Sequence, residues 1–383
     1  MKAHFETPVS RSGIGNMKGG FPCPPGTALL SGAEMDFATA PVITRALSGF
    51  AARGLYGFTL PDADYRASIQ WWMKSMRGME ILPEEIVPTA GTISALSTAL
   101  RAFTAPGDGV IIQHPSYSRF DRAILRNGRR VVSNPMLCEG GCYRLDFDDL
   151  EQKMADPSCR MLVLCNPHNP TGRVFTREEL MQIAALANRY RVVVFSDEIF
   201  AETAQPGHPC IPYVRIDPEN GVTSTSLGKA FNFTGVNHAN LIISSERLRG
   251  LFRTQQEADH FGSIDPFFYN ALRAAYTPEG AAWIRALNAH IADIAALMHR
   301  ALSGTPVVMS PVEGSFVAWL DCRALGLSDE ALERFLIEKA HIFGDPGHEY
   351  GPGGSGFVRL NIATTTDTMQ RAMDGLRAAI AAL

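Results

Sequence analysis

Three residues with reactive or polar side chains each follow a short apolar run in the middle of the chain. Asn169 comes after the run at 161–165, Asp197 after the run at 192–196, and Lys229 after a weaker run at 222–225. Apolar runs of this length are typical of strands buried in a parallel sheet. Because ligands bind beyond the carboxyl ends of such strands, neighbouring strands would bring an amide, a carboxylate and an ammonium into one crevice.

Other residues add a seat for an anion, a flat ring and a cation. Gly91 and Thr92 open a helical pattern, and the first turn of a helix offers free N–H groups and a positive dipole to a phosphate. Tyr117 follows an apolar run at 110–113, where its ring can cover a bound planar group. Arg359 lies among apolar neighbours, and a guanidinium binds a carboxylate through two parallel hydrogen bonds.

Together these groups match the requirements of pyridoxal phosphate (PLP). A lysine forms the Schiff base, an aspartate keeps the pyridine nitrogen protonated so that the ring accepts electrons, and an amide donates to the ring hydroxyl oxygen. Each residue also has an ordinary interpretation when it is taken alone: Asn169 a turn, Asp197 a helix cap, Lys229 a solvated lysine. Arg359 could equally form a buried ion pair, and Tyr117 could be core. The ordered set at the strand ends favours a PLP site with Lys229 as its catalytic residue.

The elements that must position these residues alternate between strand and helix patterns. Strands are expected at 110–113, 161–165, 192–196, 222–225 and 241–243. Between them, apolar residues recur at helical spacing from Ile93 to Phe103, and Thr176 with Glu179 forms a capping box before a second helix. This alternation predicts an α/β fold with a mostly parallel sheet.

The pattern changes near residue 281. A long helical pattern, a strand at 315–319, a helix around 332–336, a strand at 357–360 and a final helix follow in order. They predict a smaller α+β domain. The expected organisation is an N-terminal segment at 1–45 that packs with this small domain, a large PLP-binding domain at 46–280, and the small domain at 281–383.

Composition and charge exclude several classes of function. The chain has 383 residues, 46% of them apolar and 19% charged, with a net charge of −4 from 35 basic and 39 acidic residues. No basic stretch indicates nucleic-acid binding, and neither a secretory signal nor an apolar run long enough to span a membrane is present. The seven cysteines have irregular spacing, which argues against a disulfide framework and a metal site. We therefore expect a cytoplasmic protein.

Segments across almost the whole chain resemble those of fold-type I PLP enzymes, the aspartate aminotransferase superfamily. The resemblance is narrower to the cystathionine β-lyase / C–S lyase branch of class I/II aminotransferase-like proteins. It rests on the segments at 33–37 (AEMDF), 56–59 (YGFT), 103–108 (FTAPGD), 165–174 (CNPHNPTGRV), 196–199 (SDEI), 229–232 (KAFN), 350–354 (YGPGG) and 357–361 (FVRLN). It implies a large domain with a mostly parallel seven-stranded sheet, a smaller α+β domain, and a homodimer in which each partner completes the other's active site near residues 56–59.

The resemblance also implies a role for each matching residue. Lys229 is the Schiff-base lysine and proton shuttle, Asp197 partners the pyridine nitrogen, and Asn169 contacts the ring hydroxyl. Tyr117 stacks on the ring, and Arg359 binds the α-carboxylate of an amino-acid substrate. The phosphate is seated by Ala90, Gly91, Thr92 and Ser226. Asp36 and Tyr56 are further candidates for substrate contact.

Four positions depart from the pattern of this branch. Phe58 and Phe200 stand where a phosphate-binding tyrosine and a polar group beside the ring hydroxyl are usual, Gly228 replaces a serine, and Asn237 replaces an arginine or glutamine. Each lost hydrogen bond to a charged group is worth roughly 1.5–3 kcal/mol. We expect a weaker hold on the phosphate unless Tyr56, Asn237 or His238 compensates.

Three functions are compatible with these residues. The branch resemblance favours β-elimination of a cysteine thioether to pyruvate, ammonia and a thiol. A PLP-dependent aminotransferase or another specialised biosynthetic PLP enzyme is the alternative, because protonation of the cofactor instead of loss of the sulfur gives transamination. A PLP-binding regulator without turnover is a third interpretation, motivated by Phe58, Phe200 and Gly228.

Overall fold

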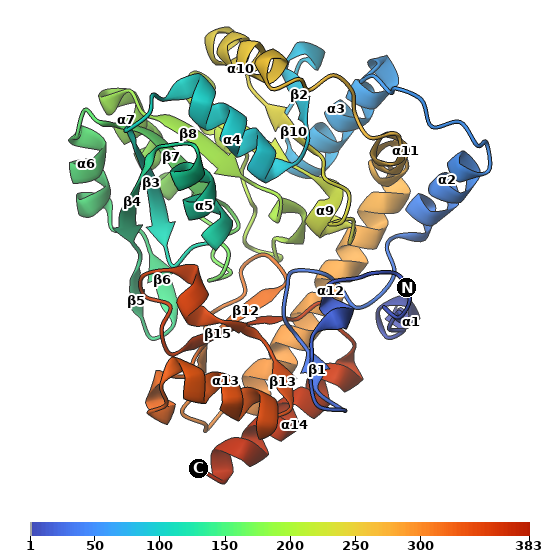
Figure 1. Ribbon diagram of the computed structural model, residues 1–383, viewed down its shortest axis with the longest axis vertical. Helices are drawn as coiled ribbons and strands as arrows, with labels where there is room; N and C mark the ends of the chain where they lie inside the picture. Colours follow the sequence, from blue (N-terminus) through green and yellow to red (C-terminus); the bar gives the residue numbers. More distant parts are fainter. Residues whose placement is uncertain (1) are drawn as a thin grey trace.

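A mixed sheet of seven strands forms the centre of the larger part of the molecule. The computed structural model describes residues 2–383, and Figure 1 shows this sheet between two layers of helices. The strand order is β2-β10-β9-β8-β7-β3-β4, with β2 (Ile86–Thr89), β3 (Gly109–His114), β4 (Arg130–Pro135), β7 (Cys159–Cys165), β8 (Val193–Asp197), β9 (Gly221–Thr225) and β10 (Ala239–Ile242). Only β10 runs antiparallel to its neighbours. The predicted α/β class with a mostly parallel seven-stranded sheet is confirmed.

Helices cover both faces of this sheet, which is why its central strands are apolar on both sides. Residues of α4 (Thr92–Phe103), α5 (Ser118–Arg126) and α10 (Glu246–Ala258) pack in one cluster with Val110, Ile112 and Val163. Residues of α6 (Phe147–Ala155), α7 (Arg177–Tyr190) and α8 (Tyr213–Ile216) pack with Ile111 and Leu162 on the other face. Helix α7 begins with the predicted capping box, in which Thr176 and Glu179 each bond the backbone of the other.

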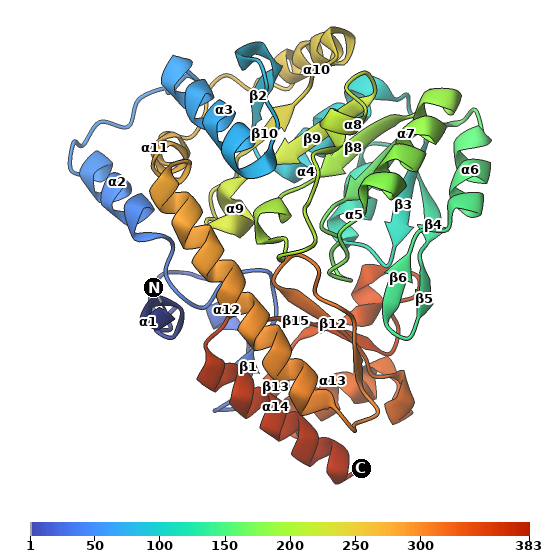
Figure 2. The same cartoon turned by 180° about the vertical axis from the view of Figure 1, so that it is seen from behind.

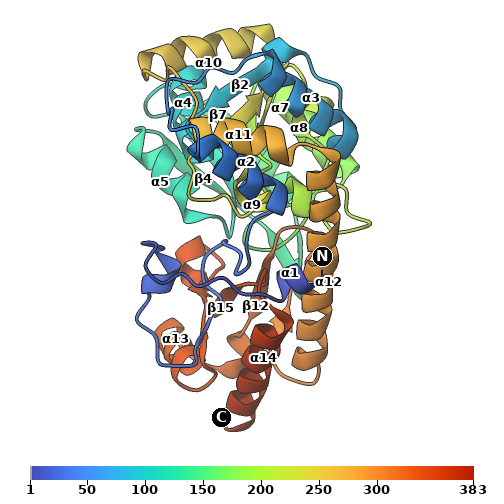
Figure 3. The ribbon, with the colours of Figure 1, turned by 90° about the vertical axis from the view of Figure 1, so that its right-hand side faces the viewer.

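A second sheet of four antiparallel strands lies beyond the carboxyl edge of the first. Its order is β11-β12-β15-β14, with β11 (Val308–Met309), β12 (Val317–Asp321), β14 (Asp345–Pro346) and β15 (Phe357–Asn361). It is covered by α12 (Pro278–Leu302), α13 (Asp329–Glu338) and α14 (Thr366–Ala381), as Figure 2 shows from behind. In Figure 3, α12 runs alongside both sheets.

Residues 2–51 connect these two regions. Strand β1 (Ala28–Leu29) pairs in parallel with β13 (Ile342–Phe343), and the chain then passes along the edge of the seven-stranded sheet to helix α2 (Pro41–Ala51). Helix α11 (Pro266–Ala275) packs against α2 and also against α3 (Ala63–Arg77). The predicted domain limits at 45 and 280 fall inside α2 and α12, and the division into domains stays a prediction. Within residues 2–383 no helix combines the length and apolar character needed to cross a membrane.

Candidate active site

Lys229 lies at the carboxyl edge of the large sheet, as the sequence predicts. It belongs to the short helix α9 (Leu227–Ala230), which Ser226 caps by accepting a hydrogen bond from the Gly228 N–H. Its Nζ donates to the carbonyl oxygen of Ala33 at 2.8 Å and lies 5.8 Å from the ring centre of Phe200. Burial, with a further contribution from Arg359, lowers the pKa of the Lys229 ammonium to about 8. A substantial neutral fraction at physiological pH makes this amine a nucleophile and a base.

Asp197 ends strand β8 and is 3% exposed. Burial raises the pKa of its carboxyl to about 7, although a hydrogen bond from the Ile199 N–H and the charge of Lys229 act in the opposite direction. A buried carboxylate of this kind is stabilised by a cationic partner. The next residue, Glu198, fixes the strand end because its buried carboxylate accepts from Arg77 at 2.5 Å and from the Tyr213 N–H at 2.7 Å.

Arg359 and Asn169 meet across the two sheets. The Nη1 of Arg359 on β15 donates to Oδ1 of Asn169 at 2.9 Å, which leaves the amide nitrogen of Asn169 to donate elsewhere. Arg359 is 4% exposed, and its guanidinium lies 5.2 Å from the ring centre of Tyr350. A buried guanidinium between two sheets can bind the carboxylate of a small molecule at this sheet edge.

The amino end of α4 forms a cradle that fits a phosphate. Its N-cap, Gly91, has φ +107° and ψ 159°, and no side chain caps the first turn. A Cβ on Gly91 would lie 3.7 Å from the backbone nitrogen of His238 and 3.8 Å from Asn237, so the backbone at 237–238 closes one side of the cradle. Thr92 Oγ1 lies 3.2 Å from the hydroxyl of Ser224. Uncapped N–H groups at the positive end of a helix are an anion site.

His238, one of the residues expected to compensate for lost phosphate contacts, does not supply a cation. The imidazole of His238 is 3.0 Å from the Tyr65 hydroxyl, and burial lowers its pKa to about 3, so it is neutral. Ser226 donates to the His238 carbonyl at 2.8 Å. The phosphate would therefore depend on the α4 dipole, backbone N–H groups and hydroxyls.

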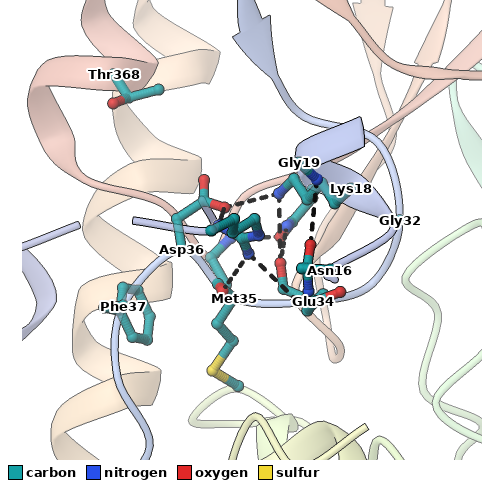
Figure 4. A network of polar contacts seen from close by, with 12 residues as sticks. Asn16, Lys18, Gly19, Gly32, Glu34, Met35, Asp36, Phe37 and Thr368 are labelled. Carbon is teal, nitrogen blue, oxygen red and sulfur yellow. Dashed lines mark hydrogen bonds and ion pairs between the residues drawn. The ribbon is translucent and has the colours of Figure 1, made fainter. Parts of the chain in front are cut away.

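The segment at 31–37 forms the wall opposite Lys229. In Figure 4, the carboxylates of Glu34 and Asp36 are bound by residues of the preceding stretch. Lys18 donates to Asp36 at 2.7 Å, Arg11 lies 3.2 Å from the same carboxylate, and Asn16 donates to Glu34 at 2.5 Å. Lys18 is buried despite its charge, and this burial lowers its pKa although Asp36 acts against the shift. These bonds from residues 11–18 hold the segment at 31–37 in place.

The structure brings together most of the residues singled out from the sequence. Lys229, Asp197, Asn169, Arg359 and Tyr117 lie at the same edge; burial raises the pKa of the Tyr117 hydroxyl, and Arg359 and Asp197 both contribute charge effects to it. Ala90, Gly91 and Thr92 form the α4 cradle with Ser226 close by, and Phe200 lies beside Lys229.

Three residues that the sequence predicts to contact the substrate or cofactor do not lie beside Lys229 of the same chain. The Asp36 carboxylate is taken up by Lys18 and Arg11. Tyr56 and Phe58 are 55% and 99% exposed, in the loop between α2 and α3. The Tyr56 ring stacks on Phe267 at 5.7 Å, and its hydroxyl donates to the Ala51 carbonyl. These positions give no contact with Lys229 of the same chain, and the predicted roles of the three residues stay predictions.

Two features of the site were not predicted from the sequence. The Ala33 carbonyl that binds Lys229 is a backbone group, which leaves no mark in the residue types. Asp345 binds Arg359; its only sequence signal is a carboxylate shortly before the FVRLN segment. Within residues 2–383, no group of His, Cys, Asp and Glu side chains has the arrangement of a metal site.

The residues fit PLP on their chemistry. The buried carboxyl of Asp197 can pair with a protonated pyridine nitrogen. The uncapped amino end of α4 can bind a phosphate. The buried Lys229, with its lowered pKa, can attack an aldehyde carbon as a neutral amine. The aromatic rings of Tyr117 and Phe200 lie at the same edge as these groups.

Comparison with known proteins gives a consistent result. Residues 29–376 match the family model described as aminotransferase class I and II. The chain is 36% identical over 358 residues to the cystathionine beta-lyase PatB of Bacillus subtilis, covering 92% of this chain and 91% of PatB. It is 31% identical over 354 residues to the protein MalY of Escherichia coli, covering 91% and 90%. The crystal structure of cystalysin from Treponema denticola, which contains pyridoxal 5'-phosphate, superimposes with a TM-score of 0.93 at 31% identity, covering 99% of this chain and 98% of cystalysin.

Proposed function

Because this chain belongs to the class I and II aminotransferase family, we propose that it is a PLP-dependent carbon–sulfur β-lyase that acts on a cysteine-thioether amino acid. The main observation in support of PLP as the cofactor is that Lys229, Asp197 and the α4 cradle lie at one edge of the sheet. The choice of a lyase is supported by the names of relatives that the chain matches over most of their length, cystathionine beta-lyase among them. The products would be pyruvate, ammonia and a thiol.

The chain's own residues supply binding and proton transfer. PLP, when bound, accepts the negative charge that develops at the substrate α-carbon. Arg359 binds the α-carboxylate, and Asn169 donates its amide N–H to the ring hydroxyl oxygen. Asp197 holds the proton on the pyridine nitrogen.

Lys229 transfers the proton of the substrate α-carbon. Its pKa of about 8 gives the amine a neutral form that removes the α-proton, and the resulting ammonium can then protonate the departing sulfur. The C–S bond breaks with its electron pair on sulfur, and a double bond forms between the α- and β-carbons. Hydrolysis of the released enamine gives pyruvate and ammonia.

Incubation with L-cystathionine and smaller thioethers tests this proposal. Formation of pyruvate and a thiol without any added keto acid supports the lyase. A product that appears only with a keto-acid acceptor would assign the chain as an aminotransferase instead. A cofactor spectrum unchanged by every amino acid would favour a PLP-binding regulator. As the matched variant, Lys229→Ala should abolish turnover, and retained turnover would refute the central assignment.

We further propose that the functional unit is a cytoplasmic homodimer with shared active sites. The loop between α2 and α3 exposes Leu55 (76%), Phe58 (99%) and Leu60 (66%), an apolar surface that a second copy would cover. This arrangement would bring Phe58 to the partner's phosphate cradle. Light scattering coupled to gel filtration should give twice the chain mass, and a monomer with full activity would refute shared sites. All seven cysteines are free, in keeping with a reducing compartment.

A further inference from the structure

Arg359 is bound by a carboxylate of its own chain. Asp345 on β14 and Arg359 on β15 are direct partners in the antiparallel register. Asp345 Oδ2 accepts from Nε of Arg359 at 3.0 Å and also from Nη2. The two side chains are 17% and 5% exposed. This pairing follows from the sheet itself, since directly opposed residues of antiparallel strands lie within side-chain reach.

The guanidinium of Arg359 has hydrogen-bond donors that its protein partners do not use. Asp345 takes one hydrogen from Nε and one from Nη2, and Asn169 takes one from Nη1. Each terminal nitrogen of a guanidinium carries a pair of hydrogens. One hydrogen on Nη1 and one on Nη2 therefore remain, so each terminal nitrogen can donate once more to a carboxylate.

Asp345 is itself held from the N-terminal segment. Its Oδ1 accepts from the Ser31 hydroxyl at 2.6 Å, and its Oδ2 accepts from the Gly32 N–H at 3.0 Å. Ser31 is 5% exposed, and the Lys18 and Arg11 contacts with Asp36 anchor the segment a few residues further on. Withdrawal of Asp345 from Arg359 would leave donors of Arg359, Ser31 and Gly32 without their acceptor, at a cost in free energy.

We propose that Asp345, fixed by Ser31, is a positioning residue for the substrate carboxylate: it holds Arg359 by one edge so that the remaining edge faces the crevice. The proposal rests on the proposed function only in assuming an α-amino acid as ligand. A carboxylate that merely competed with substrate would have to leave Arg359 on binding, and the bonds from Ser31 and Gly32 oppose that movement.

The two roles predict opposite effects on carboxylate binding. If Asp345 positions Arg359, its removal lets the guanidinium rotate and weakens carboxylate binding. If Asp345 competes, its removal frees a positive charge and strengthens binding. The holoenzyme should be titrated with L-methionine and with 3-(methylthio)propylamine, the same molecule without its carboxylate, and the dissociation constants read from cofactor absorbance and calorimetry. The sulfur of methionine is on the γ-carbon, so β-elimination cannot consume it.

The dissociation constant of the amine divided by that of methionine measures selectivity for the carboxylate. Asp345→Ala should lower this ratio about tenfold or more, Asp345→Asn less, and Ser31→Ala roughly threefold, with amine binding unchanged. Asp321→Ala is the matched control, because it removes an aspartate–arginine pair (Asp321–Arg323) at the end of β12 in the same sheet. Tighter carboxylate binding in an Asp345 variant, or an unchanged ratio in all three variants, would overturn the proposal.

Two further outcomes are separable. If Asp345→Ala does not fold, Asp345→Asn and Ser31→Ala decide the question, since both keep an acceptor beside Arg359. If thioethers give no pyruvate but the ratio falls as expected, the proposed lyase activity fails and the positioning role stands.

Discussion

Replacement of Asp197 by asparagine should make the cofactor-free protein more stable at alkaline pH. The carboxyl is 3% exposed, and its pKa is raised from 3.8 to about 7, chiefly by burial. The proton on Asp197 therefore stabilises the folded apoenzyme fully below pH 3.8, and that contribution is lost as the pH rises through about 7. Asparagine has nearly the same shape, retains an oxygen for the Ile199 N–H, and carries no charge to bury.

The magnitude follows from the width of this window. Between about pH 5.5 and pH 7 the unfolded carboxyl is ionised while the folded one keeps its proton, and the folded state loses roughly 1.4 kcal/mol per pH unit. One and a half units give about 2 kcal/mol, and above pH 7 the loss levels off. Relative to the wild type, the variant should gain about 2 kcal/mol of unfolding free energy between pH 5.5 and pH 8.5.

Urea denaturation of the two apoenzymes at both pH values measures this difference. Asp321→Asn is a suitable control because Arg323 lowers the pKa of Asp321 against the effect of burial, so its substitution should lower stability at both pH values. An Asp197→Asn apoenzyme whose advantage over the wild type did not grow with pH would refute the assignment of a buried, high-pKa carboxyl. With PLP bound, the same substitution should instead be harmful, since the pyridine nitrogen loses its anionic partner.

Three further substitutions test the cradle and the carboxylate site. Gly91→Ala imposes a side chain at φ +107°, at roughly 1–3 kcal/mol of strain, and should speed PLP loss on dialysis, followed by absorbance; unchanged retention would argue against Gly91 as part of the cradle. Phe58→Tyr should slow PLP loss in the same assay, because a hydroxyl from the partner subunit would reach the phosphate, and no change would count against the shared site. Arg359→Lys keeps the charge but loses the planar fork, so kcat/KM should fall about tenfold or more, mainly through KM; an equal fall in kcat with KM unchanged would contradict a binding role.

The sheet and the reactive residues could be predicted because their signals are local. Strands β3, β7, β8 and β9 are buried on both faces and so appear as apolar runs. The side chains at their carboxyl ends then share one edge, which is why the residue pattern alone was enough to group Lys229, Asp197 and Asn169. The strand expected at 315–319 lies at Val317–Asp321, two residues later, because Ser315 has a φ of +74° and belongs to the preceding turn.

The remaining features depend on pairing between distant segments. Strand β2 is an edge strand whose sequence is interrupted by Pro88, and β4 is an edge strand that begins with the exposed Arg130. Neither therefore shows the continuous apolar run of a central strand. The role of Asp345 depends on β14, which has two residues and includes Pro346. Such a segment becomes a strand only because β15 is already beside it.

The pairing of β1 with β13 sets an order of events during synthesis of the chain. The bond between Ser31 and Asp345 joins residues 314 positions apart, and a ribosome adds roughly 5–20 residues per second. The N-terminal wall therefore leaves the ribosome roughly 15–60 seconds before its partners. The strands that carry the cradle, Asp197 and Lys229 lie between residues 86 and 242 and can associate during this interval. The phosphate cradle can therefore form while the chain is still being synthesised, whereas the carboxylate pocket needs both ends of the chain.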